Sequence, residues 1–255
     1  MKIFYFTATG NSLAIAKRFR GELYSIPKVL KSNQFHFEDE KIGLIFPCYG
    51  FAAPSIVQEF IAKVTLKSPY IFIIMTYGNT LADSVRWLVR FAGENNITIH
   101  YADGLLMIDN CLPVFDVERE KTKEKRIEEN LNRLMADVNQ ERHYIRRGTV
   151  IDCMMTKAVQ GLLKLNPNFY SDRDFLIGDQ CNGCGTCSKV CPRDNITIDT
   201  KPGGIKPVYG GHCEFCLACI NHCPQQAIRL KKEKNPNARF RNENVTLKEI
   251  ISAND

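Results

Sequence analysis

The sequence predicts an α/β protein in which a doubly wound parallel sheet is followed by a small α+β domain. Two observations lead to this fold class. Over residues 1–147, short apolar runs alternate with helical patterns, which is typical of a parallel sheet covered by helices on both faces. Over residues 176–232, a run of closely spaced cysteines occurs twice. A chain of 255 residues is long enough for two such domains.

The elements of the first part follow from hydrophobic periodicity. Strands are expected at 2–6, 41–47, 70–77 and 97–107, and one more within 22–29. Helices are expected from about residue 11, at 54–64, at 81–95 and, as a long charged helix, at 117–147. Because ligands bind such sheets at the carboxyl ends of the strands, the loops after the first, third and fourth strands should converge on one site.

The remaining segments have simpler patterns. In residues 148–175, Ile151, Met155, Val159, Leu162 and Leu163 fall at helical spacing, so this linker is predicted to be a packed helix rather than a flexible tether. Residues 233–255 form a basic C-terminal tail, which is expected to be a solvated face or to dock on the other domain or an acidic partner.

The repeated cysteine run is the most specific signal in the chain. Cys181-x-x-Cys184-x-x-Cys187-x-x-x-Cys191-Pro192 recurs 32 residues later as Cys213-x-x-Cys216-x-x-Cys219-x-x-x-Cys223-Pro224. Ile196 aligns with Ile228 in the two copies, so each should end in a short strand. This spacing is that of two [4Fe–4S] clusters, in which the fourth cysteine of each run binds the other cluster.

The pseudo-symmetry gives two ligand sets. The first set is Cys181, Cys184, Cys187 and Cys223, and the second is Cys191, Cys213, Cys216 and Cys219. Structural zinc usually uses separated Cys-x-x-Cys pairs or histidine, and disulfides require an oxidising compartment. Neither alternative requires three cysteines in seven residues followed by a fourth before proline.

The loop after the first strand has the composition of a phosphate site. It comprises Thr7, Ala8, Thr9, Gly10, Asn11 and Ser12, between a strand and a helix. Hydroxyls and backbone amides in such a loop can bind one phosphate, and the helix N-terminus favours the negative charge. The loop lacks both the lysine of a P-loop and the G-x-G-x-x-G of a dinucleotide fold.

Two further loops offer aromatic residues beside glycines, which suits stacking on a flat ring. The second loop is Pro47, Cys48, Tyr49, Gly50 and Phe51, and the third is Thr76, Tyr77, Gly78 and Asn79. Together with the first loop they resemble flavodoxin. The resemblance implies FMN, with its phosphate in the first loop and its ring between the other two. An α/β domain that keeps the first loop but holds another phosphate ligand is the alternative.

The whole chain resembles a family of prokaryotic fusions of a flavodoxin-like domain with a two-cluster bacterial ferredoxin. We therefore expect an electron-transfer protein that relays electrons between two [4Fe–4S] clusters and FMN. An FMN-dependent reductase of a small molecule, fed by its own ferredoxin domain, is the alternative, and no catalytic residue can be named. The expected partner is a redox protein or a small-molecule acceptor, with a homodimer left open.

Composition excludes other classes. No apolar run is long enough to span a bilayer, and nothing at the N-terminus resembles an export signal, so a cytoplasmic protein is expected. The net charge of +6 is mild and the basic tail has no nucleic-acid-binding motif, so nucleic acid is not an expected partner.

Several other residues have open roles. Cys111 and Cys153 are expected to be small buried hydrophobes, whereas Cys48 should lie near the flavin. His212 and His222 adjoin cluster cysteines and are expected to bond cluster sulfur or to be solvated. Residues 109–113 are expected to form a surface loop, with a substrate pocket as the alternative.

Overall fold

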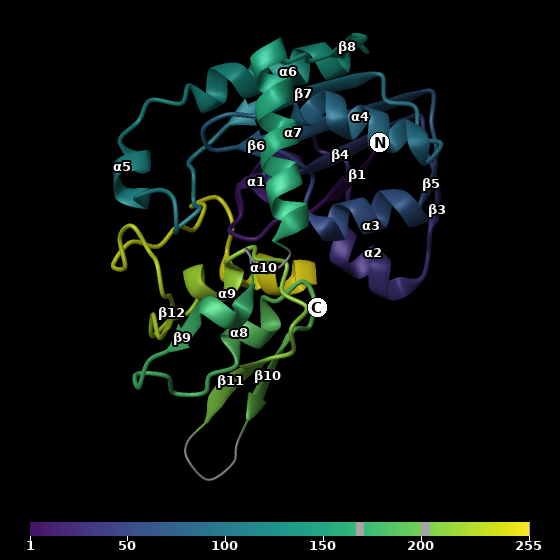
Figure 1. Cartoon of the computed structure of the whole chain (residues 1–255). Coiled ribbons are helices and arrows are strands. Elements are labelled where there is room, and N and C mark those ends of the chain that lie inside the picture. The colour runs from purple at the N-terminus through teal and green to yellow at the C-terminus, as the bar shows by residue number, and fades with distance from the viewer. Residues whose placement is uncertain (167–170, 200–204, 255) are drawn as a thin grey trace. The chain divides into compact units, whose positions relative to one another are not determined.

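The computed structural model of the chain describes residues 1–166, 171–199 and 205–254. Its contacts divide the chain into two units, whose elements are labelled in Figure 1. The first unit consists of the described residues within 1–7, 11–107 and 125–167, and the second of those within 8–10, 108–124 and 168–255. The loop at 7–12 is therefore shared, because its three central residues group with the second unit.

The first unit is built on a parallel sheet, as predicted. Its strands among the described residues are β1 (Lys2–Tyr5), β2 (Glu22–Ser25), β4 (Lys41–Pro47), β6 (Tyr70–Tyr77), β7 (Tyr101–Leu106) and β8 (Tyr144–Ile145). They pair in the order β2-β1-β4-β6-β7-β8, and every pair is parallel. The central strands are almost continuously apolar because both of their faces are buried.

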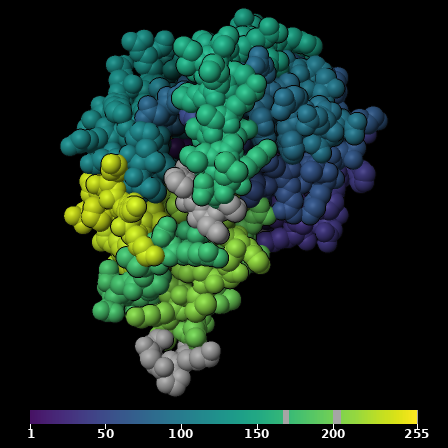
Figure 2. Space-filling model, viewed as in Figure 1, coloured from purple at the N-terminus to yellow at the C-terminus, as the bar shows by residue number. Residues whose placement is uncertain are grey.

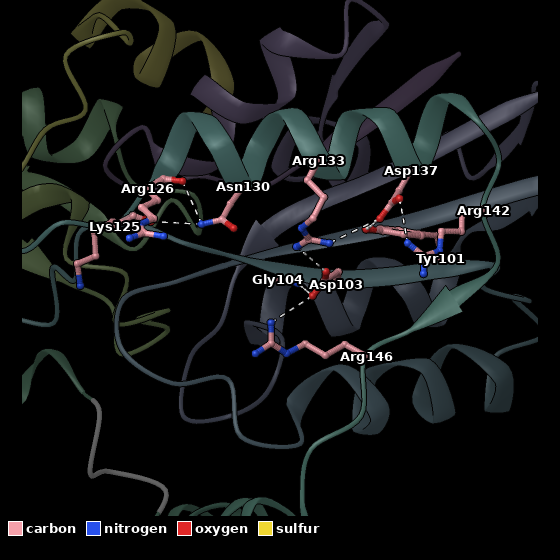
Figure 3. Close-up of polar contacts among 10 residues, drawn as sticks. All are labelled: Tyr101, Asp103, Gly104, Lys125, Arg126, Asn130, Arg133, Asp137, Arg142 and Arg146. Atoms are coloured by element: carbon pink, nitrogen blue, oxygen red, sulfur yellow. Dashed lines mark hydrogen bonds and ion pairs between the residues drawn. The ribbon is translucent and has the colours of Figure 1, made fainter.

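Helices pack on both faces of this sheet. They are α1 (Asn11–Arg18), α2 (Ile26–Ser32), α3 (Ser55–Lys63), α4 (Ser84–Glu94) and α6 (Ile127–Asn139), and the first unit also contains α7 (Val150–Leu165). Figure 3 shows α6 along one face, with other helices beyond the opposite face. Arg18 of α1 donates to Glu128 of α6 over 2.9 Å, so these two helices are neighbours.

The predicted long helix at 117–147 is wrong. The segment forms α5 (Val117–Lys121), then a break, then α6, and finally the edge strand β8. Arg126, just before α6, has a left-handed backbone with φ 46°, which no continuous helix can contain. The break has a packing cause: Val117 is buried in the second unit, whereas Leu131 and Leu134 are buried in the first.

Other local differences are small. The structure adds α2 and a separate parallel pair formed by β3 (His36–Glu38) and β5 (Thr65–Lys67), which were not predicted. The strand expected at 97–107 shortens to β7, and the helix expected at 81–95 begins at Ser84. A three-residue strand has too few residues to show a period, which is why β3 and β5 escaped recognition.

Helix α7 confirms the helical linker pattern but not the buried face expected for it. Thr149 and Asp152 form a capping box at its start. The Thr156 hydroxyl accepts a hydrogen bond from the Asp83 amide over 3.0 Å, which attaches α7 to the first unit. Ile151 and Leu162 are 76% and 52% exposed, and α7 lies on the surface in Figure 2. Residues 167–170 of the predicted linker lie outside the described residues.

The second unit contains short elements around a small apolar core. They are η1 (Asp172–Asp174), β9 (Phe175–Ile177), α8 (Thr186–Lys189), β10 (Ile196–Asp199), β11 (Lys206–Tyr209), α9 (Ala218–Asn221), β12 (Ile228–Leu230) and α10 (Leu247–Asn254), besides α5. β10 pairs with β11 and β12 with β9, both antiparallel. The strand expected after each cysteine run is present as β10 and β12.

The basic tail is not a solvated face. Arg239 is paired with Glu233 over 3.0 Å, and both side chains are almost fully buried. Phe240 is 3% exposed, and α10 buries Ile250 in the second unit. A buried arginine requires a partner for its charge, and here the partner, Glu233, belongs to the same tail. Residues 200–204 of the predicted cluster domain and residue 255 of the tail are outside the described residues. None of the described helices is long and apolar enough to cross a membrane.

Candidate redox-cofactor sites

Four cysteines from both runs line one cavity in the second unit. They are Cys181, Cys184, Cys187 and Cys223, which is the first ligand set expected from the sequence. Glycine and proline complete much of the wall, including Gly183, Gly185 and Pro224. Three thiols of one run therefore face the fourth thiol of the other run, which suits a cubane better than a local group of four.

The pKa values of the other four thiols depend on one another. Burial raises the pKa of Cys216 well above the usual value, and the neighbouring Cys213, Cys219 and Cys191 add to the rise. Burial also raises the pKa of Cys213 to about 12, with Cys191 among the contributing neighbours. Cys191 is thus close enough to Cys213 and Cys216 to affect the pKa of both thiols.

Backbone geometry around the sulfurs repeats between the two runs. The amide of Asn195 donates to Cys191 Sγ over 3.4 Å, and the equivalent amide of Ala227 donates to Cys223 Sγ over 3.3 Å. Amide hydrogen bonds to sulfur stabilise the extra electron of a reduced cluster and so raise its reduction potential. The fourth cysteine of each run receives such a bond, so the duplication extends to the hydrogen bonds of these sulfurs.

Left-handed backbone positions also repeat. Gly183 and Gly185 have φ of 69° and 74°, and the equivalent Phe215 and Leu217 have φ of 51° and 60°. Glycine adopts this conformation easily, but phenylalanine and leucine do so at a cost. The second run keeps the geometry nonetheless, with Leu217 buried in the core. Strain of this kind at a cysteine loop indicates a functional requirement on the backbone.

Exposure varies within each thiol set: Cys187 and Cys223 of the first set are buried, whereas Cys191, Cys213 and Cys216 of the second are partly buried. Cys184 of the first set is exposed, and the Thr186 hydroxyl beside it lowers its pKa. In the second set Cys219 is buried, and the Tyr209 hydroxyl lies 3.9 Å from its Sγ. No group of three or more metal-binding side chains within the described ranges is tight enough for a single ion. A cubane separates its thiolates more widely than one ion does.

In the first unit, the predicted loops meet where their strands end. Ser12 at the start of α1 shares a 2.9 Å hydrogen bond with Thr76 at the end of β6. The Cys48 amide donates to the Thr76 carbonyl over 2.8 Å. Parallel pairing of Pro47 with Thr76 produces this arrangement, because it aligns the carboxyl ends of β4 and β6.

The second loop is a tight turn held by α7. Tyr49 and Ala52 exchange two backbone hydrogen bonds of 2.9 Å, and both intervening residues, Gly50 and Phe51, are left-handed. Gln160 of α7 donates to the Phe51 carbonyl over 2.9 Å. A side chain at Gly50 would meet Leu163 of α7, because its Cβ would lie 2.7 Å from Leu163 Cδ1. Sequence reasoning missed this role of α7, since nothing local links it to residue 50.

The third loop lies among cationic side chains. The Arg146 guanidinium lies 5.9 Å from the centre of the Tyr77 ring, and Lys125 Nζ donates to the Gly78 carbonyl over 2.8 Å. Lys125 is 9% exposed. The buried Asp103 carboxylate accepts from Arg146 over 3.2 Å and from Arg133 over 3.1 Å, as Figure 3 shows. Sequence reasoning missed Lys125, Arg133 and Arg146 because they fell in the predicted long charged helix, and Asp103 because it fell within a predicted strand.

The centre of the first loop is buried inside the second unit. Ala8 and Thr9 are 6% and 3% exposed. The Ala8 carbonyl accepts from His222 Nε2 over 3.1 Å, and the Thr9 carbonyl accepts from the Asn242 amide over 2.8 Å. Within the described ranges, neither the Ala8 nor the Thr9 amide donates to an acceptor.

These contacts correct two expectations. His222 neither contacts a thiol nor is solvated, because its ring is 2% exposed and bonds the first loop. The segment at 109–113 is not a simple surface loop, because Asn110 donates to the Thr9 hydroxyl and Leu112 is 1% exposed in the core of the second unit. Burial of Leu112 is favourable because it removes an apolar side chain from water. Asn110 lies two residues earlier in the same segment and is therefore held near Thr9.

The three remaining cysteines differ. Cys111 is only partly buried, although burial raises the pKa of its thiol to about 12 and so keeps it inert. Cys153 on α7 accepts a hydrogen bond from Arg86 over 3.4 Å, so it is not a plain hydrophobe. Cys48 is half-buried in the second loop.

Comparison with known proteins identifies the cysteine domain. Residues 173–224 match the family described as 4Fe-4S dicluster domain. Pyruvate synthase subunit PorD of Methanocaldococcus jannaschii is 36% identical over 63 residues, which are 24% of this chain and 71% of that protein. An uncharacterized ferredoxin of the same organism is 33% identical over 67 residues, or 26% of this chain and 86% of its own. A ferredoxin of Methanothermococcus thermolithotrophicus is 34% identical over 58 residues, or 21% of this chain and 90% of its own.

Proposed function

The chain belongs to the ferredoxins through its 4Fe-4S dicluster domain, and from this membership we propose that it relays electrons between two [4Fe–4S] clusters and an FMN. Ferredoxin-type electron transfer through 4Fe–4S clusters is the part common to the relatives. The ligand sets, the flavin and the direction of the relay are our proposals.

Cys181, Cys184, Cys187 and Cys223 would hold one cluster, and Cys191, Cys213, Cys216 and Cys219 the other. The first set is supported by the cavity that its four thiols line. The second is supported by the mutual effects of its thiols on their pKa. When bound, each cluster would accept and release one electron.

The proposed FMN site lies at the switch point of the sheet. Counted along the chain, the strands of the large sheet have the order 2-1-3-4-5-6, and 2-1-3-4-5 is the flavodoxin-like order, in which FMN binds between strands one and three. β1 and β4 are those strands here. The observation that carries the flavin is the convergence of the strand-end loops within the first unit, where Ser12 and the Cys48 amide both bond Thr76.

The aromatic loops would hold the ring. Tyr49 and Tyr77 flank the converging strand ends, beside Gly50 and Gly78. When bound, FMN would supply a centre that accepts electrons singly or in pairs. Two clusters that each carry one electron can together supply the two electrons that FMN accepts. The relative that is a pyruvate synthase subunit suggests a larger oxidoreductase as the redox partner.

Anaerobic purification tests the proposal directly. Iron, sulfide and flavin are measured per chain, with absorption spectra before and after dithionite. We expect about eight irons and one flavin per chain. Iron without flavin after incubation with FMN would contradict the relay and leave a ferredoxin. Stopped-flow mixing with candidate acceptors then identifies the electron path, and turnover of a small molecule without a protein partner would favour the reductase.

A further inference from the structure

Asn195 links the fourth cysteine of the first run to the segment just before the second run. Its amide donates to Cys191 Sγ over 3.4 Å, and its side-chain oxygen accepts from the His212 amide over 2.6 Å. Its carbonyl accepts from the Gly210 amide over 2.8 Å. Asn195 is 5% exposed, so these bonds fix its position. All of these residues belong to the second unit.

The side-chain NH₂ group of Asn195 holds a carboxylate. A backbone amide only donates hydrogen bonds, so the side-chain oxygen must face His212. The NH₂ group therefore faces Asp172, to whose carboxylate it donates over 2.8 Å. Within the described ranges, no cation forms an ion pair with Asp172. The negative charge of Asp172 is thus held in place without being neutralised.

This charge acts on the second ligand set. Burial raises the pKa of Cys213 to about 12, and Asp172 contributes more to the rise than any other charged neighbour. Glu214 contributes less, and its carboxylate is paired with Arg193 over 2.8 Å. Asp172 therefore adds a negative charge beside this set that no ion pair among the described residues offsets.

The first ligand set has a different charge environment. Asn195 aligns with Ala227, which repeats the backbone hydrogen bonds but has no side chain that could hold a carboxylate. The Thr186 hydroxyl lowers the pKa of Cys184, and the charged side chain that contributes to the change is the cation Lys189. The duplicated backbone thus carries opposite charges beside its two sets of thiols.

Hydroxyl groups near sulfur do not distinguish the two sets. The Thr186 hydroxyl lies 3.4 Å from Cys184 Sγ, and the Tyr209 hydroxyl lies 3.9 Å from Cys219 Sγ. Each set thus has one such group, and the difference between the sets is one of charge. A nearby negative charge opposes the addition of an electron to a cluster and so lowers its reduction potential.

We propose that Asp172, held by Asn195, lowers the reduction potential of the cluster bound by the second ligand set below that of the cluster bound by the first. Asn195 is a positioning residue, because it acts through the carboxylate that it holds. An electron that enters the domain then settles at the first ligand set, and the second set holds the stronger reductant. The inference rests on the proposed ligand sets.

The test is a redox titration of anaerobically reconstituted full-length protein, in which the reduced clusters are followed by electron paramagnetic resonance. Asp172→Asn removes the charge but keeps an oxygen that accepts from Asn195. Asn195→Ala releases Asp172 and introduces the residue found at the equivalent place in the second run. Asp174→Asn is the matched control, because it removes an exposed carboxylate from the same short helix. Iron per chain is measured for every variant.

We expect two one-electron midpoints in the wild type. Asp172→Asn should favour reduction at the lower midpoint on the order of tenfold, which is about 59 mV for one electron, and leave the upper midpoint unchanged. Asn195→Ala should raise the same midpoint, and Asp174→Asn should titrate as the wild type does.

An unchanged lower midpoint in Asp172→Asn, or a shift of the upper one, would overturn the inference. Asn195→Ala that keeps its iron and both wild-type midpoints would overturn the role of Asn195. Wild-type protein without about eight irons would instead overturn the proposed function. Absence of flavin alone would contradict the relay and leave this inference standing.

Discussion

The hydroxyls of Ser12 and Thr76 lie 2.9 Å apart and share a buried hydrogen bond, although 64 residues separate them in the chain. Ser12 begins the helix after β1, and Thr76 ends β6. The bond joins the first and third loops of the proposed flavin site. Both side chains are 3% exposed or less, so neither hydroxyl has water as a substitute partner.

Replacing Thr76 by valine should destabilise the first unit. The change keeps the shape of the side chain but leaves the Ser12 hydroxyl buried without its partner, which costs about 1–3 kcal/mol of unfolding free energy. Urea denaturation measures the loss. Thr65→Val, on the exposed face of β5, is the matched control. Because the two residues are coupled, the double variant with Ser12→Ala should lose less than the sum of the single losses. Simple additivity would show that the bond contributes nothing.

Paired cysteine substitutions should distinguish crossed from local ligand sets. Cys184→Ser with Cys223→Ser removes two ligands from one proposed set, so about four irons per chain should remain. Cys184→Ser with Cys191→Ser removes one ligand from each set and should leave little iron. If each run instead held its own cluster, the first pair should leave little iron and the second pair about four irons per chain. Iron and sulfide analysis of anaerobically reconstituted protein decides between them.

Removing the charge of Lys125 should lower the midpoint potential of a bound flavin. Its ammonium group lies 2.8 Å from the Gly78 carbonyl in the third loop, where it would stabilise the negative charge of the fully reduced ring. We expect Lys125→Met to lower the midpoint by roughly 30 mV, which is about 1.4 kcal/mol for two electrons. Lys157→Met, on the exposed side of α7, is the control. Equal potentials in both variants would place the ring away from Lys125.

Stability should fall on mild acidification because of His100. Its Nδ1 accepts the Ile71 amide hydrogen over 3.0 Å, and burial, followed by the nearby His143, lowers its pKa from the usual 6.5. The folded state therefore binds fewer protons than the unfolded state. The contribution is fully present above pH 6.5 and is lost as the pH falls from there toward the folded pKa.

Denaturation at several pH values checks this. Asparagine can accept the same hydrogen bond without titrating, so His100→Asn should flatten the fall in unfolding free energy below pH 6.5. His36→Asn removes an exposed histidine and should leave the slope unchanged. A wild-type slope in His100→Asn would assign the pH dependence to other groups.

Much of the first unit was predictable because its strands are long and buried. Strands β4 and β6 were predicted to the residue, since their nearly continuous apolar runs have few other places in a folded protein. The prediction of one helix at 117–147 was wrong because this segment has no long apolar run to define its elements. Its charged residues are compatible with continuous helix, and only the burial of Val117 in one core and Leu131 in another separates α5 from α6.

The sequence alone determined the chemistry available to this protein. Cysteine spacing specifies thiolates for iron–sulfur clusters, and hydrophobic period specifies the parallel sheet, because both are local properties of the chain. Only the tertiary structure decided which distant residues serve the loops. His222 bonds Ala8, which lies 214 residues earlier in the chain. Arg146 lies over the Tyr77 ring because the chain forms strand β8 just before it, where a helix was predicted. Such contacts depend on how buried surfaces pack, and no local pattern records that.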